Sequence, residues 1–257
     1  MAEVLQSVMW CHEIIIVDME STDASLSIAT NFGCKIITHK NIGFADPARQ
    51  FGLDQTSYEW VLAIDSDEIV PKNLAERLMK IVSNNEADVV ELCFRNFFFG
   101  QELYGSGWNY RNLKVFRFFK KGFLSYGKMV HSFIEIDQKA RKLSLIDYNL
   151  AIIHFNYLDV SHFIQKLDRY TSFESQKSRA LHPILAGLYQ VVRELGGRFI
   201  ILGGWKDGWI GFYLSFAMSF YRITALTKQM TPNREAIVAR YKKTASETSI
   251  FKNEEKL

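Results

Sequence analysis

Short apolar runs alternate with helical patterns along the first third of the chain. The runs "EIIIV" at 13–17, "KIIT" at 35–38 and "WVLAI" at 60–64 are continuous and rich in β-branched residues. Such runs are typical of strands that are buried on both faces of a sheet. They predict three strands that belong to one parallel, wound α/β sheet.

Helix signals stand between these runs. Ser21, Thr22 or Asp23 can cap a helix that ends near Gly33, because apolar residues follow at helical spacing. Asp46 with Pro47 predicts a second helix start, and Pro71 a third. The alternation of strand and helix predicts parallel crossovers in this part of the chain.

The pattern changes after Ala87. Two longer aromatic strands are expected around 87–100 and 113–122, joined by a glycine-rich loop that contains "YGSGWNYRN". From Val160 onward helical patterns dominate. We therefore expect an α/β domain that ends in a mixed region at 1–155, and a helical C-terminal region at 156–257. The polar tail after Lys242 is expected to fray.

The nearly uncharged run from Gly208 to Tyr221 is shorter than the about 20 residues that span a bilayer. Three readings stay open for it: a core helix, an oligomer interface that would make a homo-oligomer, and a helix lying in a membrane interface. Lys206, Arg222 and Lys228 stand nearby and suit anionic lipid.

Composition excludes several classes of protein. With 257 residues, 48% hydrophobic, and a net charge of only +3, the chain is globular and gives no support to nucleic-acid binding. Its three cysteines lie far apart and show no CxxC spacing, which indicates reduced thiols in a cytoplasmic protein. The opening residues show no secretory signal pattern.

Carboxylates follow two of the predicted strands. Asp18 ends the first strand, and Asp65 and Asp67 follow the third in "AIDSDE". Ligands of open parallel sheets bind outside the carboxyl ends of the strands. Two aspartates one residue apart offer hard oxygen ligands to Mn²⁺ or Mg²⁺, although one such motif is expected by chance about once in a chain of this length.

The strings "IVDMESTDAS", "NIGFADPARQ" and "WVLAIDSDE", in this order, resemble the family 2 glycosyltransferases. "WCHEIIIVD", "FRNFFFGQELYGSGW", "RFFKKG" and "KMVHSFIE" are similar to a bacterial subgroup related to lipopolysaccharide core glycosyltransferases. The resemblance extends from about residue 5 to about residue 221 and also includes "IIHFNY" and "GGWKDGWIGF".

The resemblance implies that 1–155 is a nucleotide-sugar-binding and catalytic domain of glycosyltransferase A type with a mixed acceptor region. It also implies metal-dependent, inverting transfer of a hexose or related sugar. By it, Asp18 contacts the base of the nucleotide-sugar donor, a UDP-sugar first of all, and Asp65 lies near the ribose and sugar. Asp67, with Asp65 beside it, holds the divalent cation. Arg49 is a candidate partner for the donor phosphates, with a helix-surface salt bridge as the alternative.

The implied acceptor is a glycan or lipid-linked molecule of cell-envelope polysaccharide synthesis, met at the cytoplasmic face of the membrane. The catalytic base stays open. The subgroup has Glu directly after the equivalent of His131, whereas this chain has Ser132. His131, Glu135 and Glu68 are the candidates.

Family members begin with a further strand before the equivalent of "LQSVMW", so we expect either that the sequence is truncated at its start or that the protein lacks part of the donor pocket. Two rival functions follow. One is a nucleotidyltransferase, which would need a phosphate-cradling loop near the first strand. The other is an inactive family member that serves as a scaffold.

Overall fold

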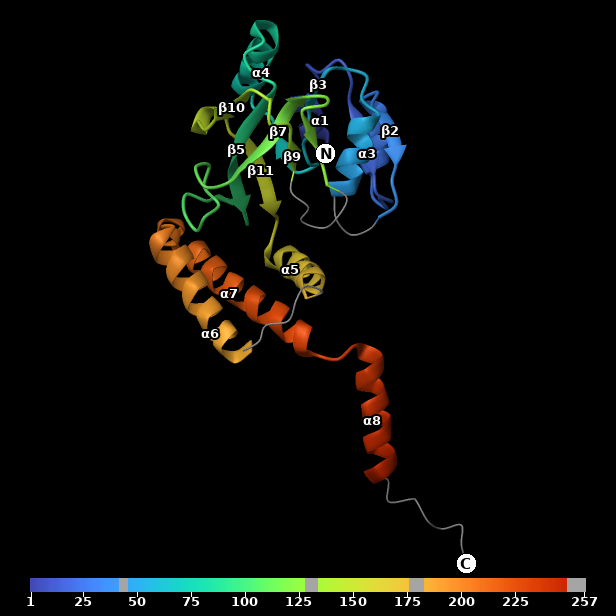
Figure 1. Cartoon of the computed structure of the whole chain (residues 1–257), viewed down its shortest axis with the longest axis vertical. Helices are drawn as coiled ribbons and strands as arrows, with labels where there is room; N and C mark the ends of the chain where they lie inside the picture. The colour runs from blue at the N-terminus through green and yellow to red at the C-terminus, as the bar shows by residue number, and fades with distance from the viewer. Residues whose placement is uncertain (42–45, 128–133, 176–182, 249–257) are drawn as a thin grey trace, which may run out of the picture.

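Figure 1 shows the computed structural model, which describes residues 1–41, 46–127, 134–175 and 183–248. The sheets and the N-terminal helices form one body, and the helices after residue 160 lie at one end of it. The last helix, α8 (Arg234–Thr248), points away from both. It carries the chain in helical form six residues past Lys242, where fraying was expected.

The first two predicted strands pair as expected. β1 (Ile15–Asp18) and β2 (Lys35–Thr38) form a parallel two-stranded sheet. Three helices belong to this part of the chain: α1 (Ala2–Ser7), α2 (Ser25–Asn31) and α3 (Asp46–Asp54). Asp46 and Pro47 do begin a helix, which confirms that signal.

The third strand does not join this sheet, so the prediction of one parallel sheet through all three strands was wrong. β3 (Trp60–Leu62) instead pairs antiparallel with β7 (Lys114–Lys120), and the Trp60 ring stacks on Phe118 with centroids 4.6 Å apart. An apolar run specifies burial but not the neighbouring strand. The aromatic face of β7 provides that burial here.

A seven-stranded mixed sheet forms the main layer, in the order β3, β7, β5, β11, β4. Its remaining members are β5 (Val89–Phe98), β11 (Ile152–Tyr157), β4 (Glu68–Ile69), β10 (Lys142–Leu145) and β6 (Gln101–Glu102), with the last two also pairing with β5. β11 runs parallel to β5 and antiparallel to β4. The pairing of β11 with β4 sets His154 opposite Glu68. A separate ribbon joins β8 (Leu124–Ser125) to β9 (Glu135–Ile136).

Helix α4 (Lys72–Asn84) covers one face of this sheet. Pro71 precedes it at the N-cap position, and Asn85 closes it in the left-handed conformation at φ 49°. Leu74, Leu78 and Ile81 are fully buried against the sheet residues Val90, Leu92 and Phe94. The three-and-four spacing of the apolar residues therefore makes this helix one wall of the main core.

The C-terminal helices pack on the end of the sheet near β11. After η1 (Tyr148–Leu150) and β11 come α5 (Val160–Glu174), α6 (Pro183–Glu194), the π-helical η2 (Leu195–Ile201), η3 (Gly204–Asp207) and α7 (Gly208–Met230). Phe98 of β5 and Leu103, which directly follows β6, share a core with Phe163, Leu167 and Leu214. The domain boundary near residue 155 stays a prediction. Within the described ranges, no helix is both long and apolar enough to cross a membrane.

The loop that follows β6 is clamped onto η3. The fully buried carboxylate of Asp207 accepts hydrogen bonds from the amides of Tyr104, at 2.6 Å, and Gly105, at 3.0 Å. An added Cβ at Gly105 would collide with the carbonyl of Gly203. The glycine is thus required here because two backbones touch.

We expect Leu78→Ala to lower the free energy of unfolding by about 2–5 kcal/mol, because it opens a cavity in the main core. Its neighbour Met79 is 44% exposed, whereas Leu78 is fully buried. Met79→Ala is therefore the control and should change stability by less than about 0.5 kcal/mol. Urea unfolding followed by circular dichroism measures both; equal losses would contradict this description of α4.

Candidate active site

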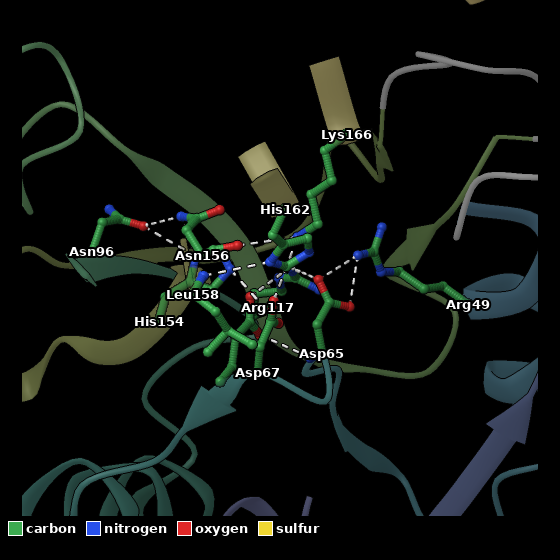
Figure 2. A network of polar contacts seen from close by, with 11 residues as sticks. Arg49, Asp65, Asp67, Asn96, Arg117, His154, Asn156, Leu158, His162 and Lys166 are labelled. Carbon is green, nitrogen blue, oxygen red and sulfur yellow. Dashed lines mark hydrogen bonds and ion pairs between the residues drawn. The ribbon is translucent and has the colours of Figure 1, made fainter. Parts of the chain in front are cut away.

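A cluster of charged side chains gathers where the β3–β4 loop meets β11 (Figure 2). The loop brings Asp65 and Asp67, β11 brings His154 and Asn156, and α5 brings Lys166. Arg49 of α3 and Arg117 of β7 reach the cluster from the other side. Five separate elements therefore converge at one end of the mixed sheet.

Two guanidinium groups hold Asp65. Arg49 Nη2 donates to both of its carboxylate oxygens at 2.7 Å, and Arg117 Nη2 donates to Oδ2 at 3.0 Å. The amide of Asp65 donates to Glu68 Oε2 at 2.9 Å. These bonds fix the start of the loop in one position.

Glu68 lies beneath this pair and is fully buried. Its Oε1 accepts a hydrogen bond from Arg117 Nη2 at 3.1 Å. Both carboxyl oxygens are thus occupied, one by Arg117 and the other by the Asp65 amide. Arg117 therefore joins two acids that would otherwise repel each other.

The pKa values of Asp65 and Glu68 are shifted in opposite directions. Burial opposes ionisation of Asp65, but Arg117 and Arg49 outweigh it and hold the pKa of that carboxyl well below its usual range. Burial raises the pKa of Glu68, and the nearby Asp65 charge adds to this rise while Arg117 opposes it. The Glu68 and Asp65 charges raise the pKa of Arg117 although its burial acts against them. Asp65 is thus the firmly ionised member of the pair.

Asp67 differs from Asp65 in its surroundings. Its side chain is 33% exposed, and its nearest charged neighbours are His154 Nε2 at 3.7 Å and Lys166 Nζ at 4.0 Å. Both distances exceed a normal hydrogen bond. Among the described residues, no hydrogen bond reaches the Asp67 carboxylate, so its oxygens can accept a further partner.

A buried amide orients His154. The Oδ1 atom of Asn96 lies 3.0 Å from His154 Nδ1 and accepts a hydrogen bond from Asn156 at 2.8 Å. The Nδ2 donor of Asn156 also lies 3.0 Å from His154 Nδ1, so an acceptor and a donor both meet this ring nitrogen. The two amides hold the ring, and its Nε2 atom faces Asp67. Asn96 is itself held by its own Nδ2, which donates to the carbonyl of Trp108 at 2.6 Å.

Lys166 and His162, both on α5, also belong to this cluster (Figure 2). Lys166 Nζ donates to the carbonyl of Asn156 at 3.1 Å and lies 4.9 Å from the Tyr157 ring centroid. Burial lowers the pKa of Lys166, and the Asp67 charge opposes that shift. Burial likewise lowers the pKa of His162. The cluster thus places an ammonium group beside Asp67 on the side opposite the Arg49–Asp65 pair.

The residues expected from the sequence fall into three groups. Asp65, Asp67, Glu68 and Arg49 lie together in the cluster. Asp18 lies at the end of β1, buried, where its Oδ1 accepts the amide of Ser21 at 3.1 Å. Glu135 is exposed on β9, and His131 lies outside the described residues.

The donor atoms suit a divalent cation only in part. Within the described ranges, no group of three His, Cys, Asp or Glu side chains could hold a metal ion. Asp67 and His154 Nε2 face each other and supply two donors. Mg²⁺ and Mn²⁺ sites that serve phosphates often use one or two protein ligands and complete the shell with water and phosphate oxygens. The cluster fits such a site through Asp67 and His154.

Comparison with known families decides the class. The model of Glycosyl transferase family 2 matches residues 11–140, which is just over half of the chain. The chain belongs to glycosyl transferase family 2. Family membership and the mixed α/β architecture confirm the expected fold class, and the transferase prediction is confirmed at the level of a glycosyltransferase. The finer likeness to lipopolysaccharide core enzymes stays a prediction.

Several relatives of this glycosyltransferase are known. An uncharacterized glycosyltransferase of Rickettsia conorii is 23% identical over 90% of this chain and 86% of its own length. Glycosyltransferase GlyG of Streptococcus pneumoniae is 36% identical, over 30% of this chain and 28% of its own. The crystal structure of S. aureus TarS residues 1–349 with UDP aligns with a TM-score of 0.45 at 15% identity, covering 94% of this chain and 87% of that one.

The sequence reading of this glycosyltransferase missed Arg117, His154, Asn96 and Lys166. Arg117 interrupts the apolar run "VFRFF", and a cation inside a buried strand needs an acid partner. His154 stands in "IIHFNY", which entered only as a point of resemblance. Asn96 and Lys166 gave no comparable signal, because their roles depend on contacts 58 and 99 positions away in the sequence.

We expect Arg117→Met to destabilise this glycosyltransferase by about 3–5 kcal/mol at about pH 7, because two carboxylates lose their buried cation. The lowered pKa of Asp65 makes its contribution to stability present above a pH of about 4 and lost below it. The raised pKa of Glu68 gives the opposite sign, a contribution present at low pH and lost as pH rises. Without Arg117, the stabilising contribution of Asp65 becomes smaller, and the stability lost through Glu68 as pH rises becomes larger. The variant should therefore lose less stability at about pH 5 than at about pH 7.

Urea unfolding at the two pH values measures the difference. Arg77→Met is the control, since Arg77 pairs with Glu86 at the surface of α4, at 2.6 Å. It should produce a small loss with little dependence on pH. A loss for Arg117→Met that is the same at both pH values would contradict the electrostatic account of the cluster.

Proposed function

We propose that this glycosyltransferase moves a hexose or related sugar, with inversion, from a nucleoside diphosphate donor to a glycan or lipid-linked acceptor. A UDP-sugar is the first donor to consider. The acceptor belongs to cell-envelope polysaccharide synthesis, with lipopolysaccharide as the first case, and transfer takes place at the cytoplasmic face of the membrane. The observation that carries this proposal is the open Asp67 carboxylate facing both His154 Nε2 and Lys166 Nζ.

In this proposal Asp67 and His154 hold a divalent cation, Mn²⁺ or Mg²⁺. When bound, that cation neutralises the negative charge of the donor's two phosphates as the sugar leaves. Lys166 adds a second positive charge on the same side, where it can pair with a phosphate oxygen. The cluster therefore binds and orients a diphosphate rather than a neutral sugar alone.

Asp65 takes a different part. Because Arg49 and Arg117 occupy its oxygens, Asp65 positions the loop and lies near the ribose and sugar of the donor, while the metal falls to Asp67. Arg49 accordingly acts on the donor through Asp65. Asp18, at the end of β1, contacts the nucleotide base.

The proton of the acceptor hydroxyl must pass to a base as the hydroxyl attacks the anomeric carbon. We do not assign this step to Glu68, because its carboxyl group is fully buried and bound to Arg117. His131 and Glu135 stay as the predicted bases.

Asp67→Asn should weaken Mn²⁺-dependent donor binding and slow sugar release by about a hundredfold or more, because an amide replaces the charged ligand. Titration calorimetry with UDP-, GDP- and dTDP-sugars, with and without Mn²⁺, measures the binding. Glu76→Gln makes the same acid-to-amide change on α4, at a side chain that is 54% exposed, and should leave donor binding unchanged.

The wild-type protein also distinguishes the rivals. Folded protein that binds no donor would favour the scaffold function. Release of pyrophosphate from a nucleoside triphosphate, rather than of a nucleoside diphosphate from its sugar, would favour a nucleotidyltransferase.

Asn96→Ala should lower Mn²⁺ affinity by about 10- to 100-fold, because the ring of His154 loses the acceptor that orients it. Electron paramagnetic resonance of free Mn²⁺, with UDP present, measures the affinity without any turnover.

The surface variant Asn84→Ala, on α4, serves as the amide control. If Asn96→Ala folds and binds Mn²⁺ as the wild type does, Asn96 does not position a ligand.

A further inference from the structure

The hairpin formed by α6, η2, η3 and α7 carries an unusual amount of exposed apolar surface. α6 and α7 lie side by side (Figure 1). On α7 the exposed large residues recur every three or four positions, and Trp209 among them is 77% exposed: Trp209, Phe212, Phe216, Phe220 and Ile223. This spacing makes one continuous stripe on the helix.

α6 has an equivalent stripe on the side away from its half-buried residues Ala186, Gly187, Gln190 and Val191. Its members are Ile184, Leu185, Leu188, Tyr189 and Val192. Ile200, Ile201 and Trp205 extend the exposed apolar surface through the turn between the helices. We call these two stripes and the turn the hairpin surface. An exposed apolar surface of this extent marks a site that binds a membrane or another molecule.

The charges of the hairpin are one-sided. Its acidic residues are Glu194 and Asp207, and both are buried. Arg193, Arg198 and Arg222 all bind Glu194, at 2.5, 2.7 and 3.3 Å, and the loop amides bind Asp207. Three guanidinium groups thus share one buried carboxylate; Arg193 is still 44% exposed, and Lys206 is exposed at the turn. The hairpin therefore presents basic groups to solvent and no exposed carboxylate.

The turn combines cations with amphipathic aromatic rings. Lys206 Nζ lies 5.6 Å from the Trp205 ring centroid. An open hollow of about 450 Å³ at the same end is lined by Tyr104, Asn112, Trp205 and Lys206, among others. Tryptophan and lysine together suit the boundary between lipid headgroups and acyl chains, where a ring needs both an apolar and a polar side.

We propose that the hairpin surface docks on an anionic lipid bilayer, with the helices lying in the interface. A second copy of the chain fits less well, since a two-fold contact would set this basic surface against an identical one that has no exposed carboxylate to pair with it.

Docking of this kind would orient the candidate active site. Arg198 Nη1 donates to the Ser106 carbonyl at 2.8 Å and stacks on Trp108, 4.5 Å from its ring centroid. Trp108 in turn accepts the hydrogen bond from Asn96, which holds His154. The hairpin and the cluster are therefore fixed relative to each other. The orientation of the active site matters only for a lipid-linked acceptor, so this part of the inference rests on the proposed function. Docking of the hairpin surface on a bilayer does not depend on that function.

Sedimentation of the full chain with vesicles tests the proposal. We expect binding to vesicles of phosphatidylcholine and phosphatidylglycerol in equal parts, weaker binding to phosphatidylcholine alone, and loss of binding at high salt. Trp209→Ser combined with Phe216→Ser should weaken binding about tenfold or more, because two exposed aromatic side chains no longer enter the interface. Lys206→Glu should weaken it about fivefold or more.

Met79→Ser combined with Val82→Ser is the matched control. Both residues are exposed and apolar but lie on α4, at the other end of the molecule (Figure 1). This variant should bind vesicles as the wild type does. Circular dichroism confirms that each variant is folded.

Three results would overturn the proposal. The first is folded wild-type protein that does not bind anionic vesicles, and the second is a Trp209/Phe216 variant that binds them as well as the wild type. The third is a dimer in light scattering, without vesicle binding, that the same double substitution dissociates; the second copy would then cover the surface. None of these results requires donor or acceptor, so failure here leaves the test of sugar transfer unaffected.

Discussion

A single buried guanidinium holds the candidate active site together. Arg117 lies between Asp65 and Glu68, two carboxylates that stand three positions apart at the end of an apolar strand. Without a cation, burial and mutual repulsion would neutralise one of them or open the loop. With Arg117 in place, the start of the loop is fixed at Asp65. Asp67, two positions further on, keeps carboxylate oxygens to which no described residue donates a hydrogen bond.

The same constraint separates the two aspartates of one short motif. Asp65 is saturated with hydrogen bonds from arginine, and its pKa is depressed. Asp67 keeps its oxygens clear and has only longer contacts to His154 and Lys166. Two identical side chains thus receive different tasks from their surroundings, one to position and one to bind. Because Asp65 stays ionised and bound to the two arginines, the position of Asp67 does not depend on whether Asp67 itself holds a ligand.

Local signals in the sequence predicted local structure well. "KIIT" became β2 with the expected bounds, and Asp46–Pro47 and Pro71 each marked a helix start. The motif "DSDE" correctly pointed to the place where charged groups gather. These features depend on neighbours a few residues apart, which a sequence shows directly.

Long-range pairing was beyond the same reasoning. The choice of β7 as the partner of β3, and the antiparallel pairing of β11 with β4, each join segments more than 50 positions apart. His154 and Arg117 enter the site only through these pairings. Periodicity fixes which face of a strand is buried, but not which strand lies beside it. The composition of the site therefore required the fold.

The contact of the glycine-rich loop with η3 has a further consequence. Gly105 lies against Gly203 backbone to backbone, and the buried Asp207 ties the loop amides across about a hundred positions of sequence. Such a contact cannot loosen on one side alone, because opening either segment would strand the buried carboxylate. The loop and the turn therefore form one cooperative unit in local unfolding, and neither can become disordered while the other stays folded.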